Sequence, residues 1–389
     1  MLGSAVTGVV LPLLVFQLTG SAAQTGVLYA IRVVPYLAFG LVAGPIADRG
    51  NRRRLIIGGN LVEGALVATI PIAHAFDVLS MAQIYAVALL AATAFVFSDA
   101  AVFGAVPALV GPERLPAANG ALASLSSCSE IAGPVIAGVL AASIGATNAI
   151  WIDAASFFIA AAVLASIRST FREAGAIPTA TATLRSAVGR ALRFIRGDRT
   201  VSTLLIVGFG NSLAFGTVLG LLVPYAVQEL GIDSDDGRIG LLYGALGVGS
   251  LLAGLIFARI FRPRRVRQLT PVSLAISGGI VAILAVNSQW VAALIAIGVF
   301  SLSITVTIMV GITYRQLAAP DDLRSSVNVI GRMTAWGGQP FGAATGAVVA
   351  ALAGVPTAYA VASVVMLTSA AGAAIVLRSS PVIGGAAPE

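Results

Sequence analysis

Five ionisable residues lie inside long apolar stretches of the sequence, where a charge is costly and therefore needs a function or a partner. They are Arg32, Glu63, Asp99, Glu130 and Arg332. Burial disfavours the charged form of a carboxylic acid, so Asp99 and Glu130 are candidates for proton binding or for holding a cationic substrate. The alternative is a structural ion pair with Arg32 or Arg332, and for Glu63 we favour this structural role. The two arginines either bind an anionic substrate or neutralise these acids.

A short basic segment, GPIADRGNRRR at 44–54, separates two of the apolar stretches. Gly44 allows a close backbone approach between helices. Asp48 can interact with a helix N-terminus, where free N–H groups favour an anion. The clustered arginines are typical of a cytoplasmic turn between two membrane helices.

Several other chemistries are excluded by composition. All 23 basic residues are arginine, and a P-loop needs a lysine, so the chain alone is not a Walker-type ATPase. Cys128 is the only cysteine and His74 the only histidine, which leaves no disulfide and no thiolate metal site. The sequence has no nucleophile–base constellation and no carboxylates at metal-ligand spacing. We therefore expect no catalytic residues, no metal, no cofactor and no enzymatic activity.

The composition is that of an integral membrane protein. Hydrophobic residues make up 58% of the chain and charged residues 10%, and the mean hydropathy is +0.97. The net charge of +7 comes from arginines in short loops, which indicates a lipid bilayer rather than nucleic acid as the partner. Apolar stretches long enough to cross a bilayer predict helices near 1–18, 25–46, 54–74, 81–107, 117–141, 148–167, 201–228, 238–260, 268–287, 290–315, 325–353 and 357–377.

The arginines also predict the orientation and the division of the chain. Apart from Arg32, Arg238 and Arg332, they lie in alternate loops and in the tail, which places both termini on the cytoplasmic side of the cell membrane. We expect two six-helix halves, a cytoplasmic basic linker between them and a cytoplasmic tail. The first half covers 1–167 and the second half 201–378, whereas the linker is 168–200 and the tail 379–389. Within the linker, 185–196 either lies on the lipid surface or is solvated.

Three blocks of the first half recur in the same order in the second half. Residues 4–15 match 212–223, residues 26–57 follow 240–269, and residues 112–168 follow 320–378. This pattern is typical of a duplicated transporter. Because Met1 pairs with Phe209, the first helix is shorter than its counterpart. We expect a truncated first helix, with Met1 as an internal methionine or the chain as a fragment; a signal peptide is the alternative.

The segment 44–54 resembles the loop between helices two and three of the major facilitator superfamily, with its pattern Gly-x-x-x-Asp-Arg-x-x-Arg-Arg. Residues 107–119 and 153–157, and Gly133-Pro134, resemble its exporter branch, which contains macrolide efflux pumps and enterobactin exporters. Two features depart from the pattern: Ser325-Ser326 stands where that branch often has Gly-Arg, and the second-half loop 258–267 has no counterpart of Asp48.

The resemblance implies an all-α membrane protein with twelve helices in two six-helix repeats. It also implies that the loop closes the cytoplasmic side. In this gate Asp48 meets helix eleven and Arg52 or Arg53 contacts helix four, whereas Arg49 both gates and sets topology. In the superfamily helices one, four, seven and ten line the cavity. Asp99, in the fourth span, is therefore the carboxylate best placed for proton coupling or for a cationic substrate. The polar or aromatic cavity candidates, each alternatively a packing residue, are Gln17, Asn211, Tyr225, Trp336 and Gln339.

From these features we expect a monomeric secondary transporter that exports amphipathic small molecules, such as drugs, antibiotics or siderophores, in exchange for protons. Three alternatives remain open from the sequence. They are a solute importer or uniporter of the same superfamily, an inactive remnant with a truncated N-terminus, and a membrane enzyme or receptor scaffold.

Overall fold

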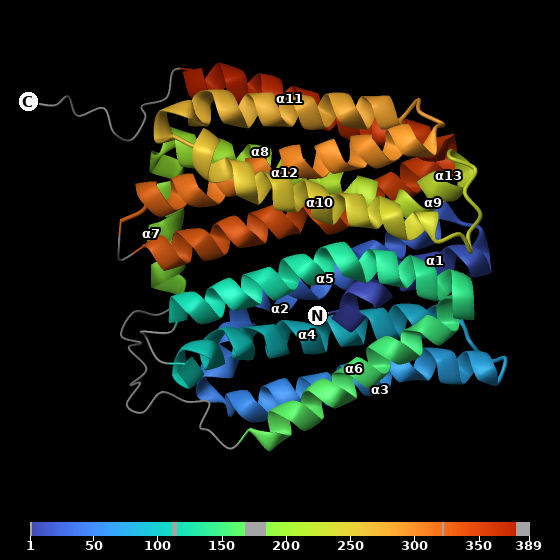
Figure 1. The fold of residues 1–389 in the computed structure, drawn as a ribbon. Helices are drawn as coiled ribbons and strands as arrows, with labels where there is room; N and C mark the ends of the chain where they lie inside the picture. Colours follow the sequence, from blue (N-terminus) through green and yellow to red (C-terminus); the bar gives the residue numbers. More distant parts are fainter. Residues whose placement is uncertain (1, 111–114, 168–183, 321–322, 379–389) are drawn as a thin grey trace, which may run out of the picture. The chain divides into compact units, whose positions relative to one another are not determined.

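The computed structural model describes residues 2–110, 115–167, 184–320 and 323–378 (Figure 1). Within these ranges the chain is helical and has no β-strand. By contacts it divides into two units, one made of Met1–Pro178 with Ile232–Gly244 and the other of Thr179–Gly231 with Ala245–Glu389. The first turns of one helix, α10, therefore group with the first unit, and the rest of that helix groups with the second.

The helices of the first unit coincide with the six spans expected from its sequence. They are α1 (Leu2–Thr19), α2 (Ala22–Arg49), α3 (Arg52–Ala75), α4 (Met81–Val110), α5 (Leu115–Ile144) and α6 (Ala146–Ser166). In this unit α3 packs between α4 and α6, α2 lies on α4, and α1 contacts α5 and α6. The turn between α2 and α3 is two residues long, and the Asn51 side chain caps α3 by accepting a hydrogen bond from the Arg54 amide at 3.2 Å.

The second half of the chain also contains its six expected spans. Its elements are α7 (Leu184–Gly197), α8 (Arg199–Gly220), α9 (Leu222–Gln228), α10 (Arg238–Ile260), a 3₁₀ turn (Pro263–Arg265), α11 (Val266–Leu284), α12 (Trp290–Ala318) and α13 (Arg324–Arg378). The expected span 201–228 is divided between α8 and α9. Two expected spans follow one another in α13, because Gly354, with φ 85°, interrupts its helical backbone just before Pro356.

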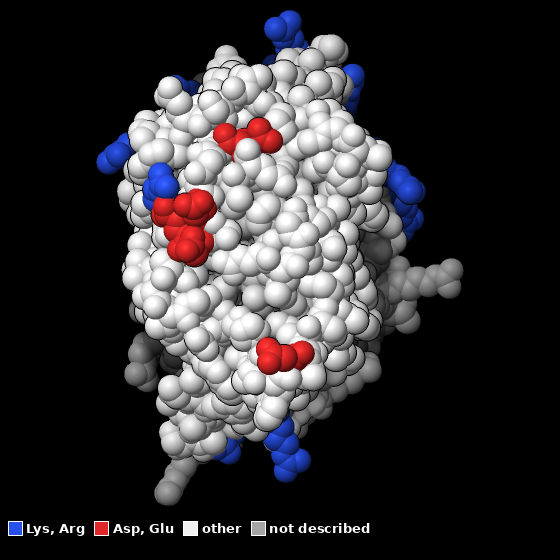
Figure 2. Space-filling view, turned by 90° about the vertical axis from the view of Figure 1, so that its right-hand side faces the viewer, with Lys and Arg blue, Asp and Glu red and all other residues white. Residues whose placement is uncertain are grey.

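Length and surface chemistry agree with a bilayer environment. Eight helices of the described chain are long and apolar enough to cross a membrane, and one of these stretches, Ile330–Arg378, holds two spans. Large apolar side chains are widely exposed, for example Leu352 at 83% and Ile159 at 63%. Figure 2 looks onto the helix ends that lie on the right in Figure 1; this face is mostly uncharged and carries a few small groups of acidic side chains. The widely exposed large apolar side chains require lipid rather than water as their solvent.

The basic linker contains a helix, α7, that packs against other helices of the second unit. On α7 the side chains of Ala191 and Ile195 are buried in a cluster with Leu204 and Tyr314. Leu192 on the same helix remains 37% exposed. The helix therefore uses part of its apolar face to contact α8 and α13, which neither the lipid-surface nor the solvated-linker expectation included.

Candidate functional site

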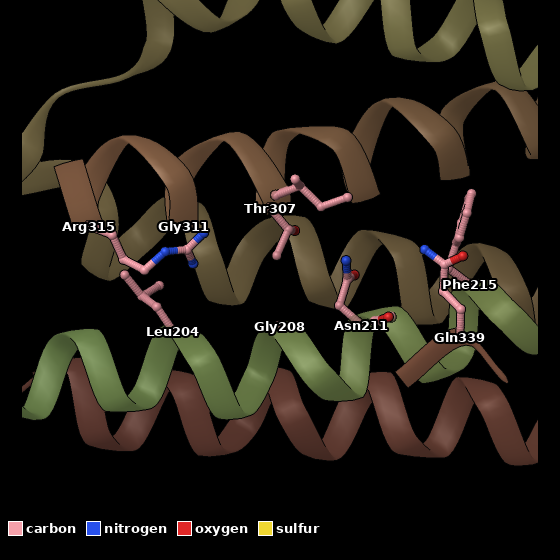
Figure 3. Close-up of a pocket in the computed structure, with 10 residues that line it drawn as sticks. Leu204, Gly208, Asn211, Phe215, Thr307, Gly311, Arg315 and Gln339 are labelled. Atoms are coloured by element: carbon pink, nitrogen blue, oxygen red, sulfur yellow. The ribbon is translucent and has the colours of Figure 1, made fainter. Parts of the chain in front are cut away.

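A small, partly open cavity lies inside the second unit, between α8, α12 and α13 (Figure 3). Its volume is about 30 Å³. That is room for one or two water molecules or a small ion, whereas pockets for drug-sized ligands are about 300–1,000 Å³. Its lining residues are Leu204, Gly208, Asn211, Ser212, Phe215, Thr307, Ile308, Gly311, Arg315 and Gln339.

The wall between α8 and α13 depends on helices that touch backbone to backbone. A Cβ on Gly216 would overlap the Gln339 backbone, and one on Gly338 would lie 2.6 Å from the Phe209 carbonyl oxygen. At the same crossing, the Thr217 hydroxyl donates a hydrogen bond of 2.8 Å to the Gly342 carbonyl. This close packing at Gly216 and Gly342 fixes where the polar residues of the wall lie.

Two amide side chains expected in a cavity do line this one. Asn211 on α8 is 1% exposed, and its Oδ1 atom has no hydrogen-bond partner among the described residues. Gln339 contributes from α13. The hydroxyl of Ser212, beside Asn211, is likewise buried without a partner in the described part of the chain. Buried polar atoms that lack a partner are rare in proteins, so this cavity needs an occupant that can bind them.

Arg315 is a site residue that sequence reasoning missed. It was counted among the cytoplasmic loop arginines, but it lies within α12 and is 5% exposed. Its guanidinium lies against Gly331 of α13, where a Cβ would come within 2.5 Å of Cζ, and close to Gly311 on its own helix. The spacing Gly311–Arg315 was the available signal, because residues four apart share one face of a helix.

The first unit contains a separate group of charged residues on α2, α3 and α6. Asp153 of α6 is 1% exposed and Glu63 of α3 is 5% exposed. Asp153 interacts electrostatically both with Glu63 and with Arg32 of α2. The Arg32 guanidinium also lies 3.5 Å from the Gly8 carbonyl oxygen of α1. Two buried carboxyl groups and one partly buried arginine thus lie inside this unit.

Close helix packing holds the two carboxyl groups at the same level. A Cβ on Gly64 would lie 3.3 Å from the Ala154 carbonyl oxygen, so α3 and α6 touch at the residues that follow Glu63 and Asp153. The Ser156 hydroxyl also contacts the Asp153 Oδ1 atom at 3.3 Å. The sequence favours a structural ion pair for Glu63, but the charged neighbour found on α6 is another acid. Asp153 was missed as a candidate, although an acid inside an apolar span is itself the signal.

The remaining candidates are not brought together in one site. Asp99 on α4 and Arg332 on α13 are exposed and each makes an interaction within the described structure. Gln17 does not line the cavity of the second unit; it donates a 3.0 Å hydrogen bond to the Ser234 carbonyl, after α9. Tyr225 is buried and donates a hydrogen bond to the Asn287 carbonyl at 3.1 Å, which supports its packing alternative.

The gating candidates are described only in part. The side chains of Asp48 and Arg49, and the surroundings of Gly44 on the same helix, lie outside the described residues, as do the side chains of Glu130 and Trp336. Arg52 makes an interaction, and Arg53 donates a 2.6 Å hydrogen bond to the Ala165 carbonyl at the C-terminal end of α6. The resemblance had implied helix four for this contact. A cation at a helix C-terminus is favourable, since carbonyl groups there lack helical partners.

Comparison with known proteins identifies the family. The family model described as Major Facilitator Superfamily matches residues 1–334. The chain is 28% identical over 295 residues to the multidrug efflux pump Tap of Mycobacterium tuberculosis, covering 72% of this chain and 68% of that protein. It is 25% identical to macrolide efflux protein A of Streptococcus pyogenes over 292 residues, covering 71% and 70%. For the enterobactin exporter EntS of Salmonella typhimurium the identity is 25% over 329 residues, covering 84% and 75%.

Solved structures with the same fold are more distant in sequence. A bacterial homologue of the human lysosomal transporter Spinster, in an inward-facing and occupied conformation, aligns with a TM-score of 0.75 at 14% identity, covering 97% of this chain and 96% of that one. The nucleoside transporter NupG aligns with a TM-score of 0.77 at 12% identity, covering 98% and 97%. At these identities the likeness establishes the fold and leaves the substrate open.

Proposed function

Because the chain belongs to the major facilitator superfamily, we propose that it is an exporter of amphipathic small molecules that works by alternating access between its two six-helix halves. The observation that carries this proposal is that relatives from three genera bear the names of a multidrug efflux pump, a macrolide efflux protein and an enterobactin exporter. Their cargoes differ in chemistry, so the class proposed here is defined by amphipathic character.

We infer that protons drive this export and that the Glu63–Asp153 pair carries them. Two carboxyl groups that are buried together cannot easily both be ionised, so one of them tends to hold a proton. Among the described residues, the charged side chains that face Asp153 are Glu63 from α3 and Arg32 from α2. A conformational change that alters either contact would bind or release that proton. This assignment favours Glu63 and Asp153 over Asp99, whose side chain is exposed.

The loop between α2 and α3 is proposed to close the cytoplasmic side. Its short length and the bond from Arg53 to the end of α6 give the loop a fixed attachment within the first unit. In the proposed gate Asp48 meets a helix N-terminus, and Arg49 and Arg52 stay at the cytoplasmic surface together with both termini. This orientation rests on the distribution of arginines along the chain.

The test of export is accumulation of a labelled macrolide and of a fluorescent cationic dye in cells with and without the protein. We expect lower steady-state accumulation in cells that contain it, and we expect a protonophore to abolish the difference. Higher accumulation would favour an importer. Equal accumulation of both probes, with the protein shown to be in the membrane, would contradict export of this substrate class.

A further inference from the structure

The cavity of the second unit contains a buried positive charge. Arg315 is 5% exposed, and an arginine side chain keeps its proton in proteins. Its Nε atom has no hydrogen-bond partner among the residues that the structure describes. None of the residues that line the cavity is acidic. A buried cation without a counter-charge is strongly unfavourable, so its presence points to a negative partner.

The direction of the side chain shows that Arg315 is aimed into the cavity rather than at the end of its own helix. Figure 3 shows it extending from near the end of α12 back towards Gly311. A Cβ on Gly311 would lie 3.3 Å from one terminal nitrogen, and a Cβ on Gly331 would lie 2.7 Å from the other. Two glycines therefore make the room that the guanidinium occupies. The last carbonyl groups of α12 lie in the opposite direction.

Further polar groups line the same space. Asn211 and Ser212, both at least nine-tenths buried, have side-chain atoms without hydrogen-bond partners in the described structure. The oxygen and nitrogen of an asparagine amide are assigned from their neighbours, so the amide of Asn211 can turn its N–H groups inward. Together with the Ser212 hydroxyl and Arg315, the wall then offers several hydrogen-bond donors to one small volume.

We propose that this cavity is a binding site for a small monovalent inorganic anion, with chloride as the occupant under ordinary salt conditions. The volume of about 30 Å³ admits a single small ion and excludes an organic substrate. The bound anion neutralises Arg315 and accepts hydrogen bonds from Asn211 and Ser212. This site lies within one unit and is separate from the carboxyl pair proposed to carry protons.

The test measures anion-dependent stability of the purified full chain in detergent. Thermal unfolding is compared in sodium chloride, bromide and gluconate at constant ionic strength. We expect chloride and bromide to raise the unfolding temperature saturably, because an anion at ten times its Kd increases the folding equilibrium constant about elevenfold. Equilibrium binding of radiolabelled chloride should saturate at one ion per chain. No difference between chloride and gluconate would overturn the proposal.

Two variants assign the effect to this cavity. Arg315→Gln removes the charge, and Gly331→Ala displaces the guanidinium while leaving the charge in place, so both should weaken chloride binding at least tenfold. Arg193→Gln, which removes an exposed arginine of α7 in the same unit, should leave it unchanged. If Arg315→Gln or Gly331→Ala bound chloride like the wild type, the site would be elsewhere. Asp321 and Asp322 lie outside the described residues. If chloride bound only after both were changed to asparagine, an acid of the chain would occupy the site in the wild type and the proposal would be overturned.

Discussion

The two buried acids of the first unit should differ sharply in what their removal costs. Asp153 faces both Arg32 and Glu63, whereas the charged side chain found facing Glu63 is another acid. Asp153→Asn therefore removes a counter-charge and leaves Arg32 facing a neutral group. Glu63→Gln removes a repulsion. Each substitution preserves size and removes one ionisable carboxyl group, which makes the pair an internally matched comparison.

The size of the difference can be worked from burial. Removing one partner of a fully buried ion pair costs about 3–5 kcal/mol. Because Arg32 is only partly buried, we take a value below that range, about 2–3 kcal/mol for Asp153→Asn. The contact between Ser156 and Oδ1 survives in asparagine, which keeps that oxygen. For Glu63→Gln we expect a change within about 1 kcal/mol in either direction, since an amide fills the same space.

Two assays separate stability from coupling. Thermal unfolding in detergent should place Asp153→Asn several degrees below the wild type and Glu63→Gln close to it. Export of the labelled macrolide should lose its dependence on external pH in Glu63→Gln, although that protein remains folded. Asp99→Asn, with its exposed side chain, serves as the control and should keep the wild-type pH profile. Equal destabilisation by the two substitutions, or a wild-type pH profile in Glu63→Gln, would refute the assignment.

Three further predictions concern other parts of the chain. Gly216→Ala should destabilise the second unit by about 1–3 kcal/mol, because the added methyl group overpacks the crossing with α13. Gly208→Ala on the same helix, where a Cβ meets nothing within 4 Å, should be neutral or slightly stabilising. Urea unfolding of the two variants measures the difference. Asp48→Asn should abolish export while membrane insertion persists, and normal export by that variant would exclude the gating role. Hydrogen bonds from Arg238, together with a 2.6 Å salt bridge, lower the pKa of Asp236. The small stabilising contribution of this pair should therefore be present above about pH 4 and be lost as the pH falls through the lowered pKa. Asp236→Asn should remove this pH dependence of the unfolding temperature.

The helices could be predicted from the sequence because a bilayer imposes a length and an apolar composition on every span. The twelve expected ranges accordingly have counterparts in the structure, including the two that Gly354 separates within α13. The break between α8 and α9 was not expected, because composition continues unchanged across Leu221. Hydropathy determines that a segment is a helix, whereas local backbone geometry determines where that helix bends.

Pairing between distant residues was predicted less well. Glu63, Asp153 and Arg32 are far apart in sequence, and only the packing of α3 against α6 shows that the two acids meet. Arg315 was placed in a loop because an arginine near the end of a span usually marks the cytoplasmic side. Its burial depends on Gly331, which belongs to another helix. Such contacts are set by which faces two helices present to each other, and no single segment encodes that.

The duplicated halves share helices but not buried charges. Among the described charged residues that are fully buried, the first unit holds the acids Glu63 and Asp153, and the second holds Arg315. Repetition of apolar spans therefore preserved the architecture while the sign of the interior charge diverged, as it did in the loop that carries Asp48 only in the first half. If the acids carry protons and Arg315 holds an anion, the pH profile of export and the chloride response of unfolding should be changed by different substitutions. Glu63→Gln should leave the chloride response of unfolding intact, and Gly331→Ala should leave the pH profile of export intact, since each substitution acts on chemistry confined to its own unit.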